Sequence, residues 1–226
     1  MNLKEDPILM EVREVIYNFL STSFLHSPTP SHIKTIIQQK LFEDFPLTLD
    51  TQDFVYALEL LTSWAKENEH TDPETLCREL LQDYNALFVG PGHLLAPPWE
   101  SVYLTEEKLT FGPPTMEVRA FYLRHGLEYF RKNHEPDDHF GLEMEFMAKL
   151  VSKQRQAQSK QEEEYYIKEQ MAFLEDHVLK WLNDFTNDVY QYSKTKYFQG
   201  LALLAREFLN WDYQNLKESE PKSPLE

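Results

Sequence analysis

Cysteine, glycine and long apolar runs are all scarce in this sequence. The single cysteine, Cys77, cannot form a disulfide within the chain, and six glycines leave few of the breaks that many-stranded proteins need. No apolar run approaches the ~20 residues of a membrane-spanning helix. Residues 8–25 are rich in apolar side chains, but Glu11, Arg13 and Glu14 interrupt them, which indicates an amphipathic helix rather than a secretory signal. We therefore expect a helical, cytoplasmic protein without stable insertion in a membrane.

Basic residues are also in the minority. The chain has 22 Lys and Arg against 38 Asp and Glu, which gives a net charge of −16. Nucleic-acid binding depends on clustered basic side chains that displace counterions from phosphates, so this balance argues against a nucleic-acid partner. The acidity either keeps the protein soluble or also attracts a basic partner. The charge alone leaves both interpretations open.

The abundant residues indicate one packed domain. Hydrophobic residues make up 42% of the 226 residues and aromatic residues 14%, enough for a substantial core. We assign residues 1–216 to a single all-α domain, a bundle of about eight to ten helices. Residues 217–226 contain two prolines and several charges, and we expect them to be a disordered tail.

Apolar residues recur at steps of three and four along most of the chain, which is typical of amphipathic helices. The pattern predicts helices at about 8–24, 33–41, 50–70, 73–88, 115–126, 140–151, 167–185 and 197–211. Thr115 is the expected cap of the fifth helix, and the polar residues 152–164 predict a helical extension or a turn. Residues 90–114 hold five prolines and three glycines, which predicts one long ordered loop.

The familiar enzyme motifs are absent. The sequence has no phosphate-binding loop, no dinucleotide fingerprint, no Gly-x-Ser-x-Gly and no His-Glu-x-x-His. Cys77 falls within an amphipathic helix, where a small core residue is more common than a nucleophile. We predict no catalytic residue, no cofactor and no metal site.

Residues 135–139, together with Glu143, form the densest group of ionisable side chains. Asp137 or Asp138 could cap the following helix, since a carboxylate there meets unpaired N–H groups. The same side chains could contact a peptide, or His139 and Glu143 could bind a divalent metal from one helix face. The residues alone leave these three interpretations open.

The proline-rich loop carries two aromatic residues, Trp99 and Tyr103, whose rings are candidates for binding a partner. A loop made rigid by proline can present such aromatics to an extended peptide at little entropic cost. The same rings could instead hold the loop onto the helices. Both interpretations fit the residues.

These segments together resemble the TorD/DmsD family. The resemblance rests on five motifs in a fixed order: residues 84–88 (YNALF), 90–91 (GP), 97–103 (PPWESVY), 111–112 (FG) and 135–141 (EPDDHFG). His177 with Trp181 resembles a weaker downstream signature. The Pro-Pro-Trp segment is most similar to the DmsD branch, although Tyr103 stands where that branch often has tryptophan and Gly92 where it can have an aromatic residue.

The resemblance implies a cytoplasmic chaperone without catalytic activity. Such a protein binds the twin-arginine signal peptide, or leader, of the catalytic subunit of a molybdopterin oxidoreductase and delays export until the cofactor is inserted. A homodimer formed by domain swapping is compatible with the family. The positions that match leader-binding residues are Leu87, Phe88, Pro98, Trp99, Tyr103, Gly112, Asp138 and His139; those that match the structural motif are Glu135, Pro136 and Asp137.

On this interpretation Asp138 pairs with arginine, Trp99 and Tyr103 receive apolar side chains, and His139 is a hydrogen-bonding neighbour. Two alternative functions also fit the sequence. One is an assembly chaperone of the NarJ type, which binds a nitrate reductase-like molybdoenzyme internally. The other is a metal-dependent hydrolase that uses the carboxylates and imidazole of residues 137–143.

Overall fold

The computed structural model describes residues 7–129 and 135–219. Over these ranges the chain forms ten α-helices and two π-helical segments and contains no strand, which confirms the all-α prediction. In chain order the elements are α1 (Pro7–Leu25), α2 (Pro30–Gln38), α3 (Gln52–Glu67), α4 (Pro73–Tyr84), η1 (Asn85–Val89), α5 (Glu100–Leu104), α6 (Pro113–Arg124), α7 (Phe140–Arg155), α8 (Lys160–Phe173), η2 (Leu174–Val178), α9 (Leu179–Tyr192) and α10 (Lys196–Ser219).

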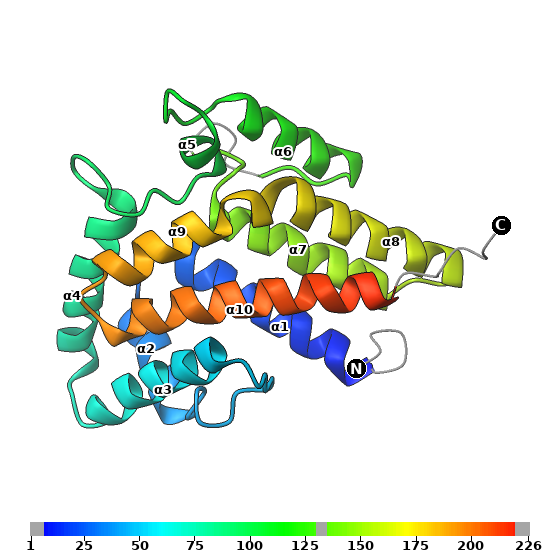
Figure 1. Ribbon diagram of the computed structural model, residues 1–226. Coiled ribbons are helices and arrows are strands. Elements are labelled where there is room, and N and C mark those ends of the chain that lie inside the picture. Colours follow the sequence, from blue (N-terminus) through cyan, green and yellow to red (C-terminus); the bar gives the residue numbers. More distant parts are fainter. Residues whose placement is uncertain (1–6, 130–134, 220–226) are drawn as a thin grey trace.

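Helix α10 is the centre of the arrangement. It packs against α3, α8 and α9, while α1 packs against α7. Figure 1 shows α10 crossing the middle of the molecule, with α3 below it and α7 and α8 above it. The short helices α5 and α6 lie together at the top, where α5 also meets α9. Helices α5 and α6 therefore lie at one edge of the central bundle.

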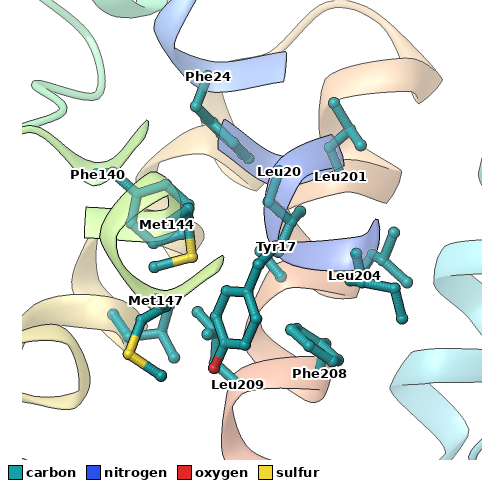
Figure 2. Packing of buried hydrophobic residues seen from close by; sticks show 14 of the residues in the cluster. Tyr17, Leu20, Phe24, Phe140, Met144, Met147, Leu201, Leu204, Phe208 and Leu209 are labelled. Carbon is teal, nitrogen blue, oxygen red and sulfur yellow. The ribbon is translucent and has the colours of Figure 1, made fainter. Parts of the chain in front are cut away.

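The core is built from the apolar stripes of α1, α7 and α10, as their periodicity predicts. Figure 2 shows side chains of all three helices meeting, among them Phe24, Phe140 and Phe208. Phe24 and Phe140 are fully buried, with ring centroids 5.0 Å apart in an edge-to-face arrangement that aromatic pairs prefer. Burial of this apolar surface is the main force that holds the bundle together.

Two glycines allow the central helices to approach closely. A Cβ atom at Gly141 would lie 2.6 Å from the Cβ of Leu25, so only glycine lets the start of α7 cross the end of α1. Similarly, a Cβ at Gly200 would lie 2.6 Å from Leu61 Cγ, where α10 crosses α3. The sequence pattern did not single out either position.

A buried ion pair also joins distant parts of the chain. Arg13 and Asp212 are both fully buried, and Arg13 Nη2 donates to Asp212 Oδ2 at 2.9 Å and to Gln170 Oε1 at 2.7 Å. Tyr17 Oη donates to the same carboxylate oxygen at 2.7 Å. Charges without water need such partners, so this network fixes the packing of α1 against α8 and α10.

Several predicted boundaries differ from the structure. The predicted loop over residues 90–114 is interrupted by α5, and α6 begins at Pro113 with Gly112 as its N-cap, so Thr115 is not the cap. Prolines suit the first turn of a helix because their missing N–H has no partner there. Within the polar stretch 152–164, α7 ends at Arg155 and Ser159 caps α8.

The last helices are longer than their apolar stripes. Helices α8 and α9 are joined without a break through the π-helical turn η2, so the predicted helix at 167–185 starts earlier and ends later. Helix α10 continues to Ser219, and residues 220–226 of the predicted tail lie outside the described residues. In the described ranges, no helix combines the length and apolar character needed to cross a membrane.

Candidate functional site

The Pro-Pro-Trp segment and the acidic segment lie side by side. Trp99 and His139 form an antiparallel β-bridge, in which Phe140 N donates to Pro98 O at 2.8 Å and Glu100 N donates to Asp138 O at 3.1 Å. The bridge places the start of α5 directly against the start of α7. Two motifs far apart in the sequence thus become one structural unit.

The helix cap at this unit is His139, not Asp137 or Asp138. His139 Nδ1 accepts a hydrogen bond from Gly141 N at 3.0 Å, as an N-cap side chain does. Burial, with a smaller contribution from His26, lowers the pKa of His139 to about 3. The ring is therefore neutral near pH 7, so its unprotonated Nδ1 can accept the hydrogen bond that the backbone N–H of Gly141 donates.

Asp137 and Asp138, either of which could have capped α7, bind neighbouring helices instead. Asp138 is fully buried, and its Oδ2 accepts a hydrogen bond from Ser101 N at 2.8 Å in the first turn of α5. Asp137 Oδ2 accepts from Arg119 Nε of α6 at 2.8 Å, and its carbonyl accepts from Tyr122 Oη at 3.0 Å. Of the three interpretations that the sequence left open, capping of α7 by Asp137 or Asp138 is wrong, because these carboxylates bind groups of α5 and α6.

Glu135 contributes a further contact to the same unit. Its Oε1 accepts a hydrogen bond from Trp99 Nε1 at 2.7 Å, which fixes the orientation of the half-buried indole. Burial is the main cause that raises the pKa of Glu135, and the hydrogen bond from Trp99 opposes it. The indole is thus held from its polar edge while part of its ring remains accessible.

A group of buried polar side chains lies beneath α5. Glu100 is almost fully buried, and its Oε2 lies 3.2 Å from His177 Nδ1. Glu143 is fully buried and lies close to Glu100, Asp138 and Trp181. Burial, together with repulsion from Glu100 and Asp138, raises the pKa of Glu143 well above its usual value.

This buried group explains why His177 and Trp181 accompany the two motifs in the sequence. Both come from the junction of η2 and α9, and the Trp181 ring packs edge-on against Phe140 at 5.8 Å. In the described ranges, no three His, Cys, Asp or Glu side chains are arranged to hold a metal ion. His139 and Glu143 lie one helical turn apart, but the imidazole caps α7 while the carboxyl is buried near Glu100.

Leu87 and Phe88 belong to the core beside the site. They lie in the π-helical turn η1 and are buried, with the Phe88 ring 5.7 Å from the ring of Phe24. The wider π turn frees carbonyls that fix the following loop, since Ala96 N donates to Leu87 O at 3.0 Å. Gly90 then ends the turn with φ 87°, a left-handed conformation that glycine adopts readily.

The predicted leader-binding residues therefore fall into two sets. One set is buried and shapes the site: Leu87, Phe88, Pro98, Asp138 and His139. The other set is partly accessible from solvent: Trp99, Tyr103 and Gly112. The structure brings both sets together around α5. Gly112 lies so close to this helix that a Cβ atom added to it would be 3.6 Å from Ser101 Cβ.

A groove of about 560 Å³ adjoins this unit and is lined in part by Tyr103. The loop after η1 and helix α5 supply apolar lining side chains, namely Leu94, Leu95, Pro97 and Val102. Helix α9 supplies two carboxylates, Asp184 and Asp188. Sequence reasoning missed these carboxylates because a charged face of a core helix usually only meets solvent, although their spacing of four residues places them on one face.

Known proteins provide comparisons for most of the chain. A family model described as the nitrate reductase delta subunit matches residues 49–187. A probable Tat proofreading chaperone DmsD of Haemophilus influenzae is 25% identical over 82% of each chain. A chaperone protein TorD of Vibrio vulnificus is 26% identical over 93% of this chain and 98% of its own length.

A solved structure shares the fold. A putative redox enzyme maturation protein from Archaeoglobus fulgidus superposes with a TM-score of 0.52 at 22% identity. The match covers 88% of this chain and 93% of the archaeal one. The helical arrangement described above is therefore an arrangement already seen in a crystal.

Proposed function

Because this chain belongs to the TorD/DmsD family of redox enzyme maturation chaperones, which the nitrate reductase delta subunit model describes, we propose that it binds the twin-arginine leader of a molybdopterin oxidoreductase. The chaperone holds the leader in the cytoplasm until the catalytic subunit has received its cofactor and folded. It performs no chemistry on its client. The relatives named above as Tat proofreading and TorD chaperones support this assignment.

The single observation that carries the proposal is the groove beside α5. A twin-arginine leader offers two guanidinium groups followed by an apolar stretch, and the groove offers carboxylates next to apolar walls. Leu104, Leu109 and Phe111, at the end of α5 and in the connection to α6, are also exposed. Exposed apolar side chains in such a group are typical of a binding surface.

The site residues divide the work according to their burial. Trp99, Tyr103 and Gly112 contact the leader, because these positions are accessible. Asp138 and His139 position α5 through their hydrogen bonds. Asp138 thus acts on the leader through Ser101 and not by the direct pairing with arginine that the sequence predicts, since none of its side chain is exposed.

A second candidate function follows from the description of the family model. The family model is described as the nitrate reductase delta subunit, and the alternative function is that of an assembly chaperone, which would bind the catalytic subunit of such an enzyme internally and not at the leader. The groove favours leader binding because an extended segment fits it without unfolding the client. We keep assembly of a nitrate reductase-like enzyme as the alternative.

A capture experiment with matched clients separates the two functions. The full-length chaperone is immobilised and offered the catalytic subunit with its leader, with Lys-Lys in place of Arg-Arg, or with the leader deleted. Leader binding predicts capture of the first client only. Equal capture of the client without a leader would contradict it and support the assembly function.

A further inference from the structure

We propose that Asp184 and Asp188 of α9 form the arginine-binding wall of the groove beside α5. The inference rests on the proposed function and goes further, since it names the atoms that select Arg-Arg over other basic sequences. Neither residue belongs to the motifs that the resemblance identifies. The ligand chemistry is a guanidinium group on an extended peptide whose apolar side chains lie against Leu94, Leu95 and Val102.

The geometry of α9 presents both carboxylates on one face. The two residues are one helical turn apart, and the residues between and beside them anchor the helix, with Phe185 and Val189 fully buried. Asp184 is exposed and Asp188 is half-buried. The carboxylates therefore sit on a rigid support and face the groove that Tyr103 and the apolar wall complete.

The electrostatics of this face favour a cation. Within the part of the chain that the structure describes, neither Asp184 nor Asp188 forms a salt bridge, whereas many other carboxylates do. Burial raises the pKa of Asp188, and repulsion from Asp184 raises it further. A guanidinium group placed between the two carboxylates would offset both the burial of Asp188 and its repulsion from Asp184.

Lys108 provides the only opposing charge that the groove lining offers besides histidine, within the described residues. Its ammonium lowers the pKa of Asp188, but no salt bridge joins the two side chains in the described ranges. Lys108 has φ 51°, a left-handed conformation that is strained for a residue with a Cβ. We place it as a weak internal counter-charge that the leader displaces.

Arginine suits this wall better than lysine does. A planar guanidinium group can donate to two carboxylates at once in a fixed geometry, while an ammonium group acts as a point charge. The Tyr103 hydroxyl already donates to Asp188 Oδ2 at 3.0 Å, so one oxygen of that carboxylate is oriented before the leader arrives. Preorganisation of this kind lowers the entropic cost of binding.

Isothermal titration of the full-length chain with a synthetic Arg-Arg leader tests the proposal. Replacing both carboxylates, Asp184→Asn with Asp188→Asn, should weaken binding by about tenfold or more at low salt and flatten the dependence on salt. Glu175→Gln with Asp176→Asn is the matched control, because it also removes two negative charges, from exposed positions on the same continuous helix outside the groove. The control should bind as the wild type does.

A second variant tests the same wall without removing a carboxylate. Lys108→Gln should bind the Arg-Arg leader roughly two- to threefold more tightly at low salt, because the internal counter-charge is gone. The proposal is overturned if the double carboxylate variant, shown by circular dichroism to be folded, binds as tightly as the wild type. If the wild type itself binds no leader, the proposed function fails and this inference fails with it.

Discussion

Tyr103 donates a hydrogen bond from Oη to Asp188 Oδ2 at 3.0 Å and so links the Pro-Pro-Trp segment to α9. The two residues come from opposite halves of the chain, and both line the groove. One is an aromatic side chain that the motifs identify, and the other is a carboxylate that they do not. Their contact makes the aromatic and the acidic parts of the site a single surface.

The raised pKa of Asp188 predicts a pH dependence of leader binding. The carboxylate binds arginine only when ionised, and burial has moved its pKa upward, so as the solution is acidified from neutral pH the affinity should begin to fall at a higher pH than an ordinary aspartate would give. The Asp188→Asn variant should bind more weakly but show a flatter pH profile over this range. Titrations of both proteins at several pH values measure the effect, and parallel profiles would contradict the role of Asp188.

Replacement of Trp99 separates the apolar contribution from the ionic one. Trp99→Ala removes a large accessible ring and should cost about 2 kcal/mol or more of leader binding, as central aromatic anchors do. Because no charge changes, the slope of affinity against salt should survive. Glu135→Gln serves as the control. It keeps Trp99 and an acceptor for the indole N–H, so the apolar contribution to leader binding should remain. A Trp99→Ala variant that loses its salt dependence would contradict this division.

Asp138 should act through the position of α5. Asp138→Ala leaves Ser101 N without its partner, which should cost about 1–3 kcal/mol of folding stability. Leader affinity should fall with it, by the same factor at low and high salt. Asp138→Asn keeps an acceptor and should be much milder in both measurements. A loss confined to low salt would instead restore the direct pairing of Asp138 with arginine.

Glu143 predicts how stability changes with pH. Its folded pKa is raised well above the unfolded value, so its contribution is fully present below about pH 4.5 and is lost as the pH rises toward the folded pKa. In that window the cost grows by about 1.4 kcal/mol per pH unit. Glu143→Gln should therefore match the wild type near pH 4 and be more stable at pH 8. Urea denaturation at both pH values checks this sign.

Most of the fold could be predicted from the sequence, because the apolar residues of core helices recur at steps of three and four. The stripe of α1, for example, includes Phe24, and the stripe of α7 includes Phe140, and both rings meet in the core. The approach of α1 to α7 at Gly141 could not be predicted, since a glycine that permits close packing looks like any other glycine in the sequence.

The site was harder to predict for a physical reason. Which of three adjacent polar residues caps α7 depends on where the helix begins, and the bridge between Trp99 and His139 sets that point. Likewise, Asp188 becomes part of a groove only because the loop after η1 folds beside α9. Tertiary contacts of this kind leave no periodic signal in the sequence.

The most direct measurement of the central claim is the affinity of the full-length chain for one leader in two versions. Isothermal titration compares the Arg-Arg peptide with its Lys-Lys counterpart at low and at high salt. We predict that the Arg-Arg peptide binds more tightly, because only guanidinium groups bind carboxylates in bidentate geometry, and that its affinity falls as salt rises. Equal affinity for the two peptides, or binding indifferent to salt, would contradict the account.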